Sequence, residues 1–250
     1  MKQVVRAAAP PSIPSPWRLT ELDAVNITFV LRGAWLFDRR LDAERLVDGL
    51  RRTLSFYPHL AGRMSGSSSV NLGNQGVPFT EKARPELSVV DVVANPALGH
   101  RFADRILPPL VRVGGDALLK IVLTQLRDGS LLNVSCSHGC VDGRAFYAFV
   151  QSWARACAGL EFPQPVLDTS CIPAPGGRPR DAVVTHALAA GWPRLRLGTI
   201  LGMVVKTAFS PKEPVLAATF TQEALRRLRA AAGGVRTIEE IGRASCRERV

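Results

Sequence analysis

The sequence predicts an α/β (α+β) protein in which helices flank a mixed β-sheet. Two apolar runs, residues 118–125 and 130–136, are separated by an Arg-Asp-Gly turn that is typical of a β-hairpin. Two further segments, which begin at Asp42 and Gly143, place apolar residues at helical spacing. Because strands and helices do not alternate in regular βαβ units, we expect a mixed sheet rather than an all-parallel one.

The N-terminal segments predict a lead-in, a strand and a helix. Residues 1–14 contain no continuous apolar core, so we expect an irregular lead-in rather than a signal peptide. The apolar run at residues 25–36 predicts a strand. Asp42 is a good N-cap for the helix that follows, and Pro58 is expected to stop that helix.

The middle of the chain predicts short elements. After a turn and an edge strand, Ser, Asn and Gly dominate residues 65–76 and indicate a loop or hairpin. Residues 76–83 are expected to form a short strand. The apolar residues 87–93 are compatible with either a strand or a short helix.

The segments after the second hairpin strand predict a helix, a linker and a final strand and helix. The helix that begins at Gly143 has an aromatic face and is expected to end near Gly159. Residues 163–180 are rich in Pro and Gly, which favours a linker. Residues 215–220 predict a strand, and residues 221–234 an amphipathic helix with a Gly-Gly end.

The last ten residues differ in origin from the rest. IGRASCRERV, at positions 241–250, matches the conceptual translation of a common short-read sequencing adapter over its whole length. We therefore expect residues 241–250 to be non-native and leave them out of the fold prediction. The natural protein is expected to continue beyond residue 240 with its own sequence.

Composition limits the classes of partner. The formal net charge of +11 suits a partner that carries phosphate groups. Nucleic acid is not expected, because there is no run of five or more like charges and few aromatic residues accompany the basic ones. The most apolar stretch, residues 195–209, is interrupted by Arg196 and Lys206 and is too short to span a membrane.

The cysteines indicate a reducing compartment. None of the five forms a C-x-x-C pair and no signal peptide is expected, which favours reduced thiols and a cytoplasmic location. Cys136, His138 and Cys140 alternate along one segment, but no second group of ligands follows them, so no metal is expected.

Several segments together resemble the BAHD family of coenzyme A-dependent acyltransferases. In the family's order they are LTELD, FYPHLAGRM, NQGVPFTEK, HGCVDG, FYAFVQSWARACAG, PVLD and FTQEALRRLRAAA. The resemblance covers roughly residues 15–240. H-x-x-x-D alone is a weak signal, but the hairpin before it and the aromatic helix after it make it specific. Related clans usually carry two adjacent histidines, whereas Ser137 precedes His138 here.

The resemblance implies a two-layer, chloramphenicol acetyltransferase-like fold and the N-terminal half of a two-domain architecture. Residues 15–160 would form the domain with the HxxxDG motif, and residues 161–240 the linker and the last strand and helix of this half. The family's C-terminal D-F-G-W-G motif does not occur in this sequence.

The implied activity is transfer of an acyl group from acyl-CoA, as co-substrate, to a small-molecule alcohol or amine. His138 is expected to be the general base, since imidazole titrates near the working pH. The thioester is already activated, so neither a covalent nucleophile nor a permanently bound cofactor is required. The residues that bind acyl-CoA are not identified by the sequence.

Asp142 and Gly143 are expected to support the site. From its position, Asp142 can cap the following helix or form an ion pair near His138. The resemblance implies the structural role, with the carboxylate pointing away from the substrate. Gly143 is expected to allow a sharp turn without an obstructing side chain.

Two alternatives stay open. One is a non-catalytic, BAHD-like binding protein, which the absence of D-F-G-W-G from the full transcript would favour. The other is a condensation-type domain that uses a carrier-protein thioester, which a downstream carrier domain would favour. In the leading hypothesis the full-length enzyme is a monomer, and the present chain is inactive alone because it supplies one wall of the channel.

Overall fold

The computed structural model describes residues 1–168, except positions 10, 12, 21–22, 24–25, 28, 67 and 107–114, together with residues 189 and 222–231. The chain separates into two units, Met1–Ala208 and Phe209–Val250. In the second unit the structure describes α8 (Gln222–Ala231), which agrees with the helix predicted there. The expectations for residues 169–180, 215–220 and 241–250 lie outside the described residues.

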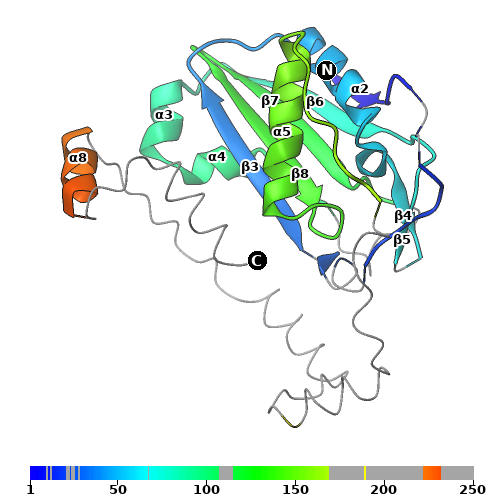
Figure 1. The fold of residues 1–250 in the computed structure, drawn as a ribbon. Helices are drawn as coiled ribbons and strands as arrows, with labels where there is room; N and C mark the ends of the chain where they lie inside the picture. Colours follow the sequence, from blue (N-terminus) through cyan, green and yellow to red (C-terminus); the bar gives the residue numbers. More distant parts are fainter. Residues whose placement is uncertain are drawn as a thin grey trace. The chain divides into compact units, whose positions relative to one another are not determined.

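A five-stranded β-sheet forms the centre of the first unit (Figure 1). The strand order is β1 (Lys2–Val5), β6 (Val77–Arg84), β7 (Leu119–Leu126), β8 (Ser130–Ser137) and β3 (Val30–Phe37). Strands β6 and β7 are parallel and the other neighbours are antiparallel, so the prediction of a mixed sheet is confirmed. A smaller antiparallel sheet contains β2 (Trp17–Arg18), β5 (Ser69–Asn71) and β4 (Arg63–Ser65).

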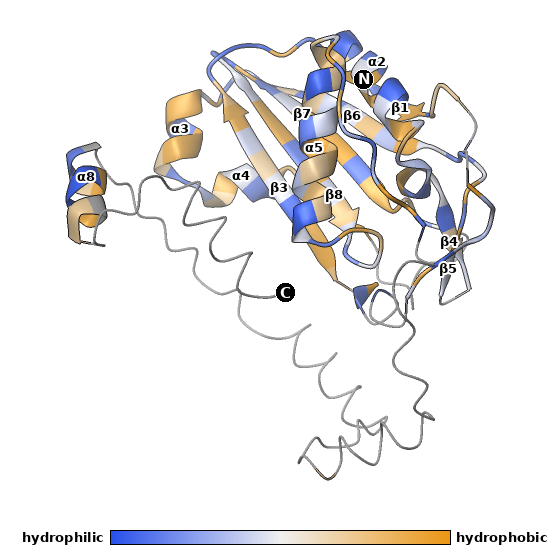
Figure 2. Cartoon of the chain, viewed as in Figure 1, coloured by the Kyte–Doolittle hydropathy of each residue, from blue (hydrophilic) through white to orange (hydrophobic). Residues whose placement is uncertain are grey.

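The β7–β8 hairpin is buried on both of its faces. Every residue of β8 is buried. Leu132 and Val134 point into the main hydrophobic core, whereas Leu131 packs with Leu126 in a second cluster on the opposite face. A strand covered on both faces has no need of strict alternation between polar and apolar residues. Figure 2 shows mostly hydrophobic residues along the neighbouring strand β3.

Helices α2 (Ala43–Leu54) and α5 (Gly143–Cys157) lie side by side against one face of the sheet (Figure 1). Each begins at an aspartate N-cap, Asp42 or Asp142, whose carboxylate accepts backbone N–H groups of the first turn. The indole Nε1 of Trp153 donates to the carbonyl oxygen of Leu46 at 2.9 Å and joins the two helices. Within the described residues, no helix is long and apolar enough to span a membrane.

Two short helices, α3 (Val89–Ala94) and α4 (Ala97–Arg101), follow β6. The side-chain amide of Asn133, which lies on the face opposite Leu132, donates to the carbonyl oxygen of Gly99 at 2.6 Å. Helix α4 therefore packs on the face of the sheet that α2 and α5 leave open. Residues 87–93, for which the sequence left strand and helix open, contain the start of α3.

Two N-terminal segments differ from their predictions. The lead-in at residues 1–14 is not wholly irregular, because β1 pairs with β6 and places Val5 opposite Val77. The strand predicted from residue 25 begins only at Val30, since Asp23 and Asn26 have helical backbone. Pairing with a strand distant in sequence explains the strand in the lead-in. The helical backbone at Asp23 and Asn26 explains the late start of β3.

A short 3₁₀ helix, η1 (Pro58–Ala61), follows α2. Helix α2 ends at Leu54, so Pro58 opens the next element instead of stopping α2 as expected. His59 is only 2% exposed, and its ring centroid lies 4.8 Å from that of Trp17. Burial penalises the charged imidazolium and lowers the pKa of His59 from 6.5 to about 4.

Acidification is expected to destabilise the fold through His59. In the unfolded chain this imidazole takes up a proton below about pH 6.5, whereas the folded chain resists protonation until about pH 4. The unfolded state thus binds more protons between pH 6.5 and pH 4. The free energy of unfolding is therefore not reduced by His59 above pH 6.5, and it falls as the pH drops toward 4. The loss reaches about 3 kcal/mol, at 1.36 kcal/mol per pKa unit.

Urea unfolding between pH 7 and pH 4 measures this loss. A His59→Leu variant, which cannot titrate at this position, should lose less stability than the wild type over the same range. Identical pH dependence in the two proteins would contradict the assignment.

Candidate active site

His138 lies in the turn that directly follows β8 and leads toward α5. Its backbone N–H donates to the carbonyl oxygen of Phe29 at 2.9 Å, and the N–H of Cys140 donates to that of Ser137 at 3.1 Å. Ser137 is in turn bonded through its own N–H to the carbonyl oxygen of Leu118 at 2.8 Å. The backbone of the turn is thus held by the residue before β7, by the segment before β3 and by its own internal bond.

The imidazole of His138 is half-buried. Nδ1 is buried and has no hydrogen-bond partner among the described residues. A carboxylate that accepts from Nδ1, as in a serine protease triad, is therefore not part of the described geometry. The position of the ring depends on packing and on the backbone of the turn.

Asp142 is bonded to helix α5. Its side chain is exposed, and its carboxylate accepts the backbone N–H of Ala145 at 2.7 Å. The extended backbone at Asp142, with φ −86° and ψ −178°, is typical of an N-cap. In this arrangement the carboxylate fixes the start of α5, and with it the length of the turn that carries His138.

The glycine that close packing requires in this turn is Gly139, not Gly143. A Cβ atom on Gly143 would meet no described heavy atom within 4 Å, and its φ lies outside the left-handed region. The expectation that Gly143 makes room for a sharp turn is therefore wrong. A Cβ on Gly139 would lie 2.6 Å from Ile27 Cδ1 and 2.7 Å from the carbonyl oxygen of Asp23.

Alanine substitutions at Gly139 and Gly143 are expected to have different effects on stability. We expect Gly139→Ala to destabilise the fold by about 1–3 kcal/mol, because the added methyl group displaces the backbone at Asp23 and Ile27. Gly143→Ala, at the first position of α5, should change stability by less than about 0.5 kcal/mol. Urea unfolding of the two variants checks the difference, and equal costs at both positions would contradict it.

Sequence reasoning missed Gly139 and the segment before β3. The signal for Gly139 was its place directly after the histidine at the end of a buried strand, where backbones approach closely. Nothing in the local sequence indicates that the carbonyl groups of Ile27 and Phe29 contact the turn, since each contact joins positions more than 100 residues apart.

The cysteines on either side of His138 are packed side chains. Cys136 is 1% exposed and Cys140 is 7% exposed. Burial, with a smaller effect of the nearby Cys140, raises the pKa of the Cys136 thiol well above its usual range. The thiol therefore stays protonated at neutral pH. Across the part of the chain that the structure describes, no three His, Cys, Asp or Glu side chains are grouped to hold a metal.

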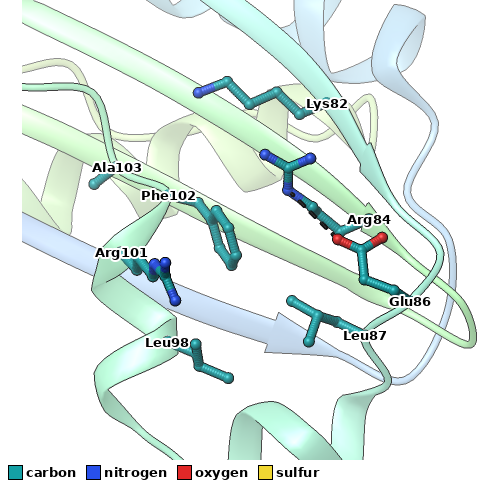
Figure 3. A pocket seen from close by; sticks show the side chains of 8 residues that line it. All are labelled: Lys82, Arg84, Glu86, Leu87, Leu98, Arg101, Phe102 and Ala103. Atoms are coloured by element: carbon teal, nitrogen blue, oxygen red, sulfur yellow. Dashed lines mark ion pairs between the residues drawn. The ribbon is translucent and has the colours of Figure 1, made fainter.

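A surface cavity of about 500 Å³ lies beside the C-terminal end of β6 (Figure 3). Two of its basic side chains have partners: Lys82 lies 3.5 Å from Asp104, and Arg84 lies 3.9 Å from Glu86 and 5.6 Å above the Phe102 ring. Strand β8 runs antiparallel to β6 and β7. The C-terminal end of β6 therefore lies beside the start of β8, and His138 lies at the opposite end of these strands. The cavity is not part of the histidine site.

The chain matches known transferases by sequence. Residues 1–190 match the family model described as Transferase family. Tryptamine hydroxycinnamoyltransferase 2 of Oryza sativa subsp. japonica is 32% identical over 54% of this chain and 32% of its own length. Vinorine synthase of Rauvolfia serpentina is 28% identical over 64% of this chain and 42% of its own length. The chain thus spans less than half the length of these relatives.

Solved structures share the fold. The crystal structure of vinorine synthase superposes with a TM-score of 0.62 at 20% identity, over 96% of this chain and 57% of that one. F. graminearum TRI101, complexed with coenzyme A and T-2 mycotoxin, gives a TM-score of 0.55 at 13% identity, over 66% of this chain and 45% of that one. With the family model matched over residues 1–190, the chain belongs to the Transferase family, the BAHD family of acyl-CoA-dependent acyltransferases.

Proposed function

We propose that this chain is the N-terminal half of a cytoplasmic, monomeric enzyme that transfers an acyl group from acyl-CoA to an alcohol or amine, with His138 as general base. The observation that carries the proposal is the position of His138. Its backbone is hydrogen-bonded at the end of a fully buried strand, while its side chain is only half-buried. A base must be held rigidly yet remain accessible to the proton that it removes.

The reaction balances with a single protein base. Because Nδ1 is buried, we assign Nε2 as the atom that removes the proton from the acceptor substrate. As the acceptor oxygen or nitrogen attacks the thioester carbonyl carbon, Nε2 takes the proton from the acceptor. The tetrahedral intermediate then collapses, the carbon–sulfur bond breaks, and the departing thiolate receives the proton from the imidazolium. Ester or amide and free CoA thiol are the products, and His138 is restored.

The roles of the neighbouring residues follow from their contacts. Asp142 holds the start of α5 through the N–H of Ala145 and takes no part in proton transfer. Cys136 and Cys140 flank His138 but are buried, so a thiol nucleophile is not assigned. Because the chain spans less than half of its curated relatives, we infer that the remaining half completes the substrate channel. The present chain alone is then inactive.

The proposal is tested on the protein encoded by the complete transcript. Release of CoA thiol is measured with hydroxycinnamoyl-CoA and tryptamine, and with acetyl-CoA and an alcohol, following the donor and acceptor classes in the relatives' names. We expect acceptor-dependent release in at least one of these arms and none from the present 250-residue chain.

A complete protein that binds CoA but releases no thiol with any acyl-CoA and acceptor would contradict the proposed function and favour a non-catalytic protein. If transfer requires an acyl group on a carrier protein rather than on free CoA, the proposed function is wrong and the condensation-type reaction takes its place.

A further inference from the structure

The segment before β3 begins with a reciprocal capping box. Asp23 Oδ2 accepts hydrogen bonds from the backbone N–H of Thr20 at 3.1 Å and from its hydroxyl at 2.6 Å. The hydroxyl oxygen of Thr20 accepts the backbone N–H of Asp23 at 3.2 Å. Such an arrangement satisfies two backbone donors at the start of a helical turn and fixes the direction in which the chain leaves it.

The chain that leaves this turn contacts the turn of His138 through two backbone carbonyl groups. The carbonyl oxygen of Phe29 accepts the N–H of His138 at 2.9 Å. The carbonyl oxygen of Ile27 accepts the hydroxyl of Ser137 at 3.4 Å. Both carbonyl groups belong to residues within six positions of Asp23 in the sequence.

The capping box also touches the histidine turn directly. The space beside Gly139 is occupied by the carbonyl oxygen of Asp23 and by Ile27, which is 6% exposed. A backbone approach this close leaves little freedom for the turn to shift relative to Asp23. The backbone of Asp23, which the capping box holds, thus packs directly against Gly139, the residue after His138.

We propose that Asp23 is a positioning residue for His138, acting through its capping box with Thr20; the proposal rests on the proposed role of His138 as general base. No described side chain orients the imidazole through Nδ1. The position of the imidazole ring relative to the acceptor is therefore set by the backbone of its turn, which Asp23, Ile27 and Phe29 contact. A displacement of about 1 Å in a catalytic group can cost about 100-fold in rate.

The chain contains a matched control for this proposal. Ser88 and Asp91 form a second capping box at the start of α3. Asp91 Oδ2 accepts the backbone N–H of Ser88 at 2.8 Å and its hydroxyl at 2.5 Å, and Ser88 Oγ accepts the backbone N–H of Asp91 at 3.2 Å. Val89, beside it, donates its N–H to the carboxylate of Asp128 in the turn before β8. This box therefore lies at the other end of an eight-residue strand, about 25 Å from His138 at 3.3 Å per residue.

The experiment compares Asp23→Ala, Asp23→Asn and Asp91→Ala in the complete protein. We expect Asp23→Ala to lower kcat about 10- to 100-fold while KM for acyl-CoA stays within about twofold. Asp23→Asn, which keeps an acceptor oxygen in place, should recover most of kcat. Asp91→Ala should lower the melting temperature about as much as Asp23→Ala but leave kcat unchanged. Thr20→Val replaces Asp23→Ala if the latter does not fold.

A second readout does not depend on activity. Hydrogen exchange of the His138 amide, which is bonded to the Phe29 carbonyl, should accelerate in Asp23→Ala and not in Asp91→Ala. Equal kcat in wild type and Asp23→Ala, or equal losses in both alanine variants, would overturn the positioning role. Failure of the proposed function is distinct: the complete wild-type protein would then release no CoA thiol, or His138→Ala would retain the wild-type rate. The exchange comparison would still report whether Asp23 holds the turn.

Discussion

Replacement of His138 by alanine is expected to lower kcat of the complete enzyme by about 10²- to 10⁴-fold, the contribution typical of a positioned general base. Without the imidazole, the acceptor must lose its proton to water while it attacks the thioester. The measurement is steady-state release of CoA thiol with saturating acyl-CoA and acceptor.

The control for His138→Ala is stability. The side chain is half-buried and its fixed contacts are made by the backbone, which alanine retains. The variant should therefore melt within a few degrees of the wild type. A near wild-type kcat in a folded variant would remove His138 from the mechanism.

The largest effect on stability is expected at Trp153. This side chain is 2% exposed, packs with Phe149 at a ring separation of 6.3 Å, and donates its indole N–H to the Leu46 carbonyl oxygen. Trp153→Ala leaves a cavity between α2 and α5 and removes the bond that joins them. We expect a loss of about 3–5 kcal/mol, measured by urea unfolding.

Trp153→Phe is the matched comparison, because it keeps most of the ring and loses the indole N–H. Its expected cost is smaller, about 1–2 kcal/mol. A loss below 1 kcal/mol for Trp153→Ala would show that the α2–α5 layer does not depend on this contact.

The parts of the fold that the sequence predicts well are those with local causes. Helices α2 and α5 begin at Asp42 and Asp142, whose side chains cap the first turn within three residues. The β7–β8 hairpin follows from two apolar runs and a turn between them. These signals are contained in short windows, so no knowledge of the rest of the chain is needed to read them.

The parts that were missed depend on contacts distant in sequence. Strand β1 is four residues long and is stabilised by pairing with β6, more than 70 positions away. The need for glycine at position 139 arises from Ile27 and Asp23, which approach it from another segment. Local pattern pointed to the Asp142-Gly143 pair because these residues are the N-cap and first residue of a clear helix, although Gly143 has open space around it.

The same distinction applies to the candidate site. His138 stands out in the sequence because a hairpin precedes it and an aromatic helix follows it. Its support by Asp23, Ile27 and Phe29 is not visible there, since the carbonyl groups that contact the turn belong to the backbone and have no side-chain signature. The LTELD segment was recognised as part of the resemblance, and its contacts with the turn emerge only in the folded chain.

The most direct test of His138 as general base is a rapid-quench single turnover of the complete enzyme with labelled acyl-CoA. We expect label to pass to the acceptor only when acceptor is present, with no label retained on the protein, and His138→Ala to slow this step by the factor seen in kcat. Label that accumulates on the wild-type protein without acceptor, or a chemical step of equal rate in wild type and variant, would contradict the account.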